Sequence, residues 1–510
     1  MDERERARAR ARAKAARERE RKKRVMRIRI AILVILAAVL VVLLILVARL
    51  RKNSGSDTAD TAASAVSQVE STETGEAGES EGIPIDTAEE TTPAAGSREA
   101  IIAEAQTKAL QYDYQGAIDL LNTVSNLEND TEASNMITEY QTAMSSLVAT
   151  SPYNVTHVFF HSLVVDPSRG FSLTDDNSGW NNGTEGFCEW MTTVDEFNRI
   201  MDQMYERGYV LISIYDMVEE TVGEDGVTYM TPKEIYLPEG KIPFVLSLDD
   251  LSYYHSYDGR GCATRMIVGE DGTPTCEYVD ADGNTLVGSY DCVPLLDDFL
   301  EEHPDFSYKG AKGTIALTGY NGILGYRTDY CYRDRVDLTS DQEAWLAIHP
   351  EYNWETECAN AKAVADAIKA DGWTFASHTW GHIHIGDVDM ERLQTDTEKW
   401  LNYVETLIGD TDIIIFAHGQ DLATWTEEYE STEKFQYLKG QGFNIYCNVD
   451  SSQYFVEYSD TYMRQGRRNL DGYRLWQAVF GGDDKTSDLY DAASVWDQQR
   501  PTDAELYDLM

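Results

Sequence analysis

Positive charge is scarce in most of this chain of 510 residues, which has 43 Lys and Arg against 88 Asp and Glu. Residues 1–52 hold 17 of the positive side chains, so the remaining 458 residues carry only 26 basic against 83 acidic ones. A surface with this excess of negative charge repels phosphate backbones, which argues against a nucleic-acid-binding protein. The chain is 42% hydrophobic, which argues against global disorder.

Cysteine is also sparse. The seven cysteines form no Cys-x-x-Cys pair, so no cysteine-based metal site is indicated. An exported domain permits disulfides, but the number of cysteines is odd and their pairing cannot be read from the sequence.

The chain has a single long hydrophobic run, residues 30–48, with 19 apolar residues and no charge. At about 1.5 Å rise per residue it just spans a hydrocarbon core of roughly 30 Å, which predicts a transmembrane helix. A cleaved signal peptide is the alternative, but its apolar region is shorter, roughly 7–15 residues. The 14 Lys and Arg between Arg4 and Arg29 predict that segment 1–29 stays cytoplasmic and the rest lies outside. We therefore expect a single-pass protein of the cell membrane.

Two segments separate this helix from the main domain. Residues 53–97 contain no Lys or Arg and are rich in Ser, Thr, Glu, Gly and Ala, which predicts a disordered acidic stalk. Residues 98–150 have apolar positions at helical spacing, which predicts two or three short helices that resemble a single tetratricopeptide unit. We interpret this segment as a helical spacer or a dimerising element.

Residues 151–510 alternate apolar strand-like runs with helical stretches, which predicts one α/β domain. The alternation suits either a parallel α/β barrel or an open α/β sheet. Of the two, we expect a distorted (β/α) barrel of about seven parallel strands. Residues 259–288 interrupt the alternation with turn-rich sequence and are expected to form an inserted β-hairpin. The expected strands are 157–162, 209–214, 242–248, 313–319, 374–377, 412–417 and 444–449, and the expected helices are 193–207, 294–302, 356–370, 389–408 and 432–440.

Polar residues with metal-binding chemistry follow two of these strands. Asp249 and Asp250 come at the end of one, and His378 and His382 follow another. Taken alone, the Asp pair is typical of a solvated helix cap. In parallel α/β barrels, however, the C-terminal strand ends share one face, so these side chains are expected to meet. Two imidazoles and a carboxylate with an open position describe a catalytic site for a divalent metal, with zinc as the first choice.

At these residues the sequence resembles the polysaccharide deacetylases of carbohydrate esterase family four. The segments that carry the resemblance are Ser247-Leu248-Asp249-Asp250-Leu251 and His378-Thr379-Trp380-Gly381-His382, with weaker likeness in FFHS, FQYLKGQGFNIYCNVD and RRNLDGYRL. The resemblance implies that Asp249 is the catalytic base and that Asp250, His378 and His382 bind the metal. It also implies a bacterial hydrolase that removes N-acetyl groups from a cell-envelope polysaccharide outside the membrane, either peptidoglycan or a poly-N-acetylglucosamine type.

The sequence departs from the family pattern in three places. Leu251 replaces a glycine, and the third motif reads Phe-Ala-His-Gly-Gln-Asp over 416–421, without the arginine that would tune the base. No histidine follows His418, so the usual late catalytic acid is missing. We expect His161 to be the acid, with His418 as the second candidate. Residues expected to contact the sugar are Tyr320, Trp380 and His418.

Two other functions remain open at this point. One is a non-catalytic glycan-binding or scaffolding protein on the same fold. The altered third motif and the missing late histidine favour this alternative. The other is a glycosidase that uses Asp249 with a second carboxylate. The expected partners are an N-acetylated cell-surface glycan and, through residues 30–48, the membrane; no nucleic acid is expected.

Overall fold

The computed structural model of the chain describes residues 96–173, 183–423 and 429–507. The basic segment 1–29, the apolar run 30–48 and all but the end of the stalk 53–97 lie outside these residues, so the predictions made for them stay predictions. Within the described residues, no helix is both long and apolar enough to cross a membrane.

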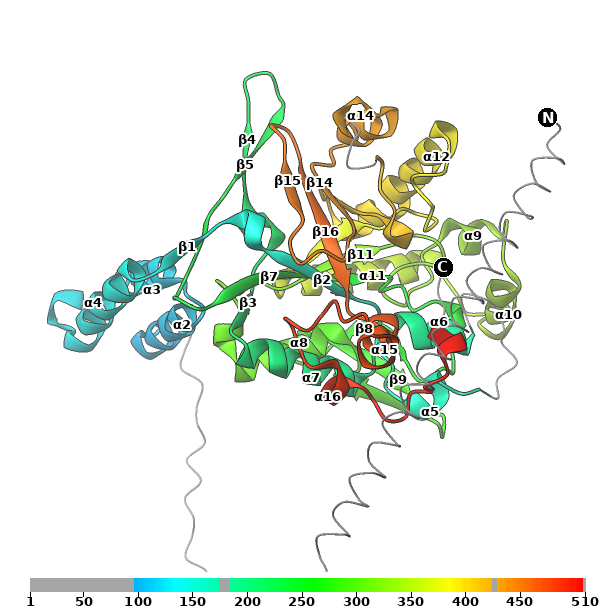
Figure 1. Cartoon of the computed structure of the whole chain (residues 1–510), viewed down its shortest axis with the longest axis horizontal. Coiled ribbons are helices and arrows are strands. Elements are labelled where there is room, and N and C mark those ends of the chain that lie inside the picture. Colours follow the sequence, from blue (N-terminus) through cyan, green and yellow to red (C-terminus); the bar gives the residue numbers. More distant parts are fainter. Residues whose placement is uncertain (1–95, 174–182, 424–428, 508–510) are drawn as a thin grey trace, which may run out of the picture. The chain divides into compact units, whose positions relative to one another are not determined.

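The core of the fold is a ring of parallel strands that closes on itself (Figure 1). Neighbours around the ring follow the order β7, β11, β12, β13, β14, β16, β2 and back to β7. The closed ring confirms the predicted α/β barrel. Its strands are β2 (Thr156–Phe160), β7 (Ile242–Asp249), β11 (Thr314–Leu317), β12 (Thr374–Ser377), β13 (Ile413–Ile415), β14 (Ile445–Val449) and β16 (Met463–Asn469).

One predicted member of the ring is wrong. The predicted strand 209–214 forms β3 (Tyr209–Leu211), which pairs with the first half of β7, Ile242 to Phe244. The second half of β7, from Ser247 to Asp249, pairs with β11 instead, so β3 lies beside the ring. The seventh place in the ring belongs to β16, whose sequence MRQGRRN has no apolar pattern.

The predicted helices are all present and pack with the strands into one large hydrophobic core. In α7, Phe197, Ile200 and Met204 recur at helical spacing and are fully buried, while Thr193 and Glu196 form a capping box at its start. The five helices are α7 (Val194–Glu206), α8 (Cys292–Glu302), α11 (Trp354–Ala370), α12 (Met390–Trp400) and α14 (Glu433–Gly440).

The N-terminal described segment forms three helices with a small core of their own, as predicted for 98–150: α2 (Arg98–Leu110), α3 (Tyr114–Leu121) and α4 (Thr131–Ser145). β1 (Val148–Thr150) then pairs with β6 (Ile235–Leu237). The hairpin of β4 (Val218–Val222) and β5 (Thr228–Pro232) projects away from the ring (Figure 1).

The insertion contains one strand more than the predicted hairpin. Its three antiparallel strands are β8 (Ala263–Val268), β9 (Pro274–Val279) and β10 (Thr285–Gly288). β15 (Val456–Tyr458) pairs antiparallel with β16. The connections hold shorter helices: α5 (Pro167–Gly170), α6 (Thr184–Trp190), α9 (Tyr330–Asp334), α10 (Ser340–Ile348), α13 (Thr406–Ile408), α15 (Gly472–Trp476) and α16 (Ala492–Val495). All seven cysteines are buried and free.

Candidate metal centre

The two motifs meet because of the order of the strands. β7 and β12 lie on either side of β11, with Asp249 opposite Ala316 and Ala316 opposite Ala376. His378 therefore follows β12 at nearly the level at which Asp250 follows β7. Asp250 and His378, 128 positions apart in the sequence, thus come to the same mouth of the barrel, where enzymes of this architecture place their chemistry.

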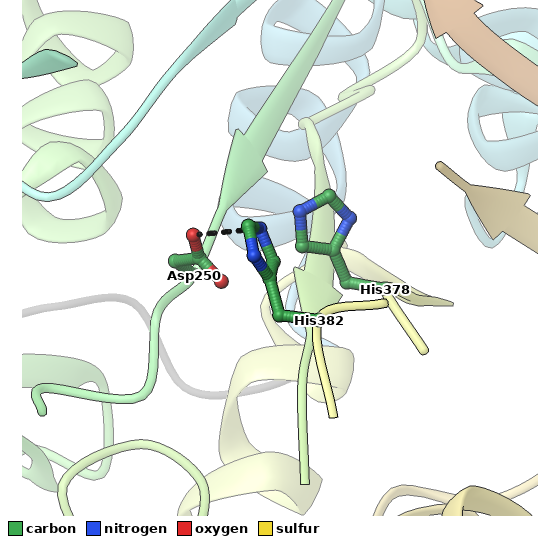
Figure 2. Close-up of side chains that lie close together, drawn as sticks. All are labelled: Asp250, His378 and His382. Carbon is green, nitrogen blue, oxygen red and sulfur yellow. Dashed lines mark ion pairs between the residues drawn. The ribbon is translucent and has the colours of Figure 1, made fainter. Parts of the chain in front are cut away.

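Asp250, His378 and His382 form a compact cluster, and their side chains point toward one another (Figure 2). One ligand atom from each lies within 4.8 Å of the others. His382 Nε2 is 3.5 Å from Asp250 Oδ2, and the two imidazole centroids are 5.0 Å apart. The three residues that the sequence singled out as ligands therefore lie together, although the cluster alone does not say which metal it binds.

The cluster sits on tightly turned backbone. Asp250, Thr379 and His382 have φ angles of 60°, 63° and 48°, a left-handed conformation that non-glycine residues adopt at a cost. Hydrogen bonds hold this conformation: Asp396 accepts from the backbone N–H groups of Trp380 and Gly381 at 2.7 and 3.0 Å, and Thr379 Oγ1 accepts from that of Ile383. The two histidines therefore converge across a pinned turn and not along a helix.

The cluster residues are in states that suit a metal. His378 Nδ1 lies 2.8 Å from the carbonyl oxygen of Ile415, so Nδ1 carries the proton and Nε2 is left as the ligand atom. Burial lowers the pKa of His382 to about 3, which keeps its ring neutral. Burial acts to raise the pKa of Asp250, but the neighbouring imidazoles and the Tyr254 hydroxyl, 2.7 Å from Oδ1, bring it below its ordinary value. Two imidazoles and a carboxylate fit zinc or another divalent transition metal.

Asp249 lies beside this cluster, with Oδ2 at 3.8 Å from His378 Nε2, and is held by Arg467. Arg467 Nη1 donates to Oδ1 at 2.7 Å and Nη2 to Oδ2 at 2.9 Å, and both side chains are almost fully buried. Burial alone would raise the pKa of Asp249, but the charge and hydrogen bonds of Arg467, together with the neighbouring His378 and His161, bring the pKa well below the ordinary value. The arginine missing from the third motif is thus supplied by β16.

A second layer of polar side chains fixes Arg467. Its Nη1 also donates to Ser247 Oγ at 3.1 Å, and its guanidinium lies 4.1 Å from the centre of the Phe159 ring. His157 bridges Ser247 and Gln465 with contacts of 2.9 and 3.1 Å. Burial, with the nearby charge of Arg467, lowers the pKa of His157 to about 3, so this ring is neutral and adds no charge to the site.

A cavity of about 570 Å³ opens over these residues. It is lined by Asp249, Asp250, His378 and His382, and also by the predicted residues His161, Tyr320 and His418. Tyr320 stacks on Tyr254, with centroids 4.8 Å apart and planes 14° apart. Trp380 does not reach this cavity: its ring is buried, with Lys399 Nζ 4.3 Å from the ring centre.

The two candidate acids lie on opposite strands of the site. His161 follows β2, and its Nδ1 contacts the carbonyl oxygen of Trp190 at 3.1 Å. His418 follows β13, and its Nε2 contacts the carbonyl oxygen of His382 at 3.0 Å, while its ring stacks on His384 at 3.7 Å. His418 therefore supports the turn that carries a candidate ligand, and no local sequence pattern indicates this role.

Comparison with models of protein families finds no match. Comparison with curated proteins finds none either. Among solved structures, the chain is similar to one described as "Streptococcus pyogenes deacetylase PplD in complex with acetate", with a TM-score of 0.32 and 10% sequence identity. The similarity covers 64% of this chain and 95% of that chain. A likeness this distant carries no argument about chemistry, so any assignment of function depends on the side chains of the cavity.

Proposed function

We propose that the protein is a metal-dependent hydrolase that removes N-acetyl groups from a cell-envelope polysaccharide. The observation that carries the proposal is the cluster of Asp250, His378 and His382 beside the Asp249–Arg467 ion pair, at the base of one open cavity. A carboxylate kept ionised next to three ligands with room for a fourth is the arrangement that amide hydrolysis by water needs.

In this proposal Asp249 is the general base. A divalent ion held by the three ligands would lower the pKa of water from about 15.7 to about 7 and polarise the acetyl carbonyl. Asp249 accepts the proton of the attacking water, which requires an ionised carboxylate, and Arg467 supplies that condition. Because Arg467 binds both oxygens of Asp249, it also fixes the direction from which the carboxylate faces the water.

His161 is the proposed general acid, which protonates the departing amine. Its contact with the carbonyl oxygen of Trp190 means that Nδ1 bears a proton and that Nε2 is the atom available for transfer. Asp471 is almost fully buried, and its carboxylate lies close enough to His161 for an electrostatic interaction between the two side chains.

We further propose that the domain acts outside the cell, attached to the membrane through residues 30–48. The support for this is the 19-residue apolar run and the basic segment that precedes it. The partner would be an N-acetylated glycan of the cell envelope.

The test is acetate release from N-acetylglucosamine oligomers and from peptidoglycan by the purified ectodomain, before and after treatment with a chelator and re-addition of zinc or cobalt. His378→Ala and His382→Ala should lose metal in elemental analysis. Asp249→Asn should keep the metal and lose at least about 100-fold in turnover, because only the base is removed.

Three outcomes would contradict the proposal. Full metal content in both histidine variants would show that His378 and His382 are not the metal ligands. Metal without acetate release from any acetylated glycan would favour a binding or scaffolding role. New reducing ends without acetate would favour a glycosidase.

A further inference from the structure

One arginine of the cavity lining is left without a charged partner. Among the described lining residues, Arg474 is the single Lys or Arg. Its Nε donates to the neutral amide oxygen of Asn469 at 2.9 Å, and within the described part of the chain it forms no ion pair. By contrast, Arg464, Arg468 and Arg500 each bind a carboxylate.

The nearest candidate partner, Asp471, is engaged elsewhere. Its Oδ1 accepts from the backbone N–H of Arg474 at 2.8 Å, and its Oδ2 accepts from Asn469 Nδ2 at 2.7 Å. Burial raises the pKa of Asp471, and the hydrogen bonds from Asn469 and from the backbone N–H of Arg474, with the weaker charge effects of His161 and Arg474, only partly oppose this effect. Both oxygens of Asp471 therefore already accept hydrogen bonds, and the carboxylate caps α15. The two Nη groups of Arg474 remain available for a ligand.

Arg474 is also held on rigid backbone. It lies on α15, which packs against α6 so closely that a Cβ on Gly472 would be 1.9 Å from the carbonyl oxygen of Cys188. Asp471 caps the helix, and Asn469 fixes the guanidinium from the end of β16. A guanidinium held in this way loses little freedom when it binds a ligand, which favours selective recognition over loose attraction.

The position of Arg474 relative to the chemistry indicates what it would contact. In the proposed reaction the acetyl group faces Asp250 and the two histidines, and the amine faces His161, so the sugar ring must extend past His161. Arg474 lines the same cavity as His161, together with Asn469 and Asp471, which both hydrogen-bond to Arg474. A substituent on the sugar being deacetylated, or on the neighbouring sugar, would therefore lie within reach of Arg474.

From this arrangement we propose that Arg474 binds an anionic substituent of the glycan, so that the enzyme acts on acidic polymers in preference to neutral ones. The inference rests on the proposed deacetylase function. The two Nη groups match the two oxygens of a carboxylate or of a phosphate, either of which could be carried by the sugar. Of the two candidate polymers, peptidoglycan strands are acidic and poly-N-acetylglucosamine is not. An anion-binding Arg474 therefore favours the acidic polymer as the substrate.

The experiment measures binding without turnover, in protein that carries Asp249→Asn. Calorimetry would compare three ligands of equal length: a neutral N-acetylglucosamine oligomer, one in which alternate sugars carry a carboxylate, and one that carries a phosphate. The variants are Arg474→Gln, Arg474→Lys and, as a control for the loss of one positive charge, Lys362→Gln on the exposed face of α11.

We expect the carboxylated or the phosphorylated oligomer to bind about ten-fold more tightly than the neutral one, since a charged hydrogen-bonded pair contributes about that much. Arg474→Gln should abolish the preference and leave neutral binding within about two-fold, while Arg474→Lys keeps part of it and Lys362→Gln keeps all of it. Whichever of the carboxylated and phosphorylated oligomers binds more tightly identifies the anionic group that Arg474 recognises.

The inference is overturned if the neutral oligomer binds as tightly as both anionic ones, or if Arg474→Gln weakens all three ligands equally. Because binding is measured in an inactive background, a failure of the deacetylase proposal would appear only as absent acetate release. The two failures are therefore distinguishable.

Discussion

Asp249 and Arg467 form a buried ion pair whose partners are 218 positions apart in the chain. Taking two charges out of water is costly, and such a pair is retained only where its geometry is good and its remaining donors are satisfied. The first condition holds here, because Arg467 binds both carboxylate oxygens and Nη1 also donates to Ser247, whereas the buried Nε of Arg467 has no hydrogen-bond partner among the described residues. The pair keeps a carboxylate ionised at a depth where burial would otherwise protonate it.

Replacement of Arg467 by Gln should therefore change the pH dependence of the reaction. Activity is present where Asp249 is ionised and is lost as the pH falls through its pKa. Without Arg467 the effect of burial is opposed only by the neighbouring His378 and His161, so the pKa of Asp249 rises and the acid limb of kcat/KM moves to higher pH. The measurement is a pH–rate profile, with elemental analysis to show that the metal is kept.

Arg467→Lys is the matched control, since it keeps the charge and loses the two-point contact. Its acid limb should lie between those of the wild type and of Arg467→Gln. An unchanged profile in Arg467→Gln would show that Asp249 owes its ionisation to another group.

At the scale of elements, two turns build the site, one after β12 and one after β13. His418, in the second turn, has a φ of 57° and contacts the carbonyl oxygen of His382 in the first. Its ring lies 4.2 Å from that of His382. The position of a candidate ligand thus depends on a residue from the neighbouring strand.

His418→Asn should weaken metal binding about 10–100-fold, the usual cost of losing a group that orients a ligand. Asn tolerates the left-handed backbone, so the change isolates the imidazole from backbone strain. The dissociation constant would be measured by competition with a chelator. His349→Ala is the control, because His349 stacks on Trp345 outside this cavity. Equal metal affinity in both variants would contradict the supporting role.

The strands show how far the sequence predicts the elements. Six strands of the ring were predicted because parallel strands buried on both faces read as apolar runs. β16 was not predicted as a strand, because Arg464, Arg467 and Arg468 make its sequence look like a surface loop, although all three side chains are buried. Their partners, Asp421, Asp249 and Asp488, come from other elements, and only pairing with them makes this strand suitable for a core.

At the scale of the whole molecule, the C-terminal segment returns to support the site. Arg500 donates to Glu196 from Nε at 2.6 Å and from Nη2 at 2.8 Å, and both side chains are fully buried. Arg500 also donates to the carbonyl oxygens of Cys188 and Met191 at the end of α6. Between these two residues lies Trp190, whose carbonyl oxygen orients His161. The end of the chain is thereby coupled to the proposed acid.

Arg500→Ala should lower the free energy of unfolding by about 3–5 kcal/mol, because it leaves the Glu196 carboxylate buried and uncompensated. Urea denaturation would measure this loss. The double change Glu196→Gln with Arg500→Met removes both charges and should cost clearly less. Equal losses in the single and double variants would show that packing, and not the unpaired charge, is responsible.

The sequence by itself determined the barrel class, most of its strands, and the three residues of the metal cluster with the neighbouring Asp249. These features are local, since an apolar run followed at once by a polar ligand shows both the strand and its functional end. Only the tertiary structure decided that β16 closes the ring, that Arg467 is the partner of Asp249, that His418 supports His382, and that Arg474 stands unpaired in the cavity. Each of these depends on which charges meet across strands distant in the chain, and no local pattern records that choice.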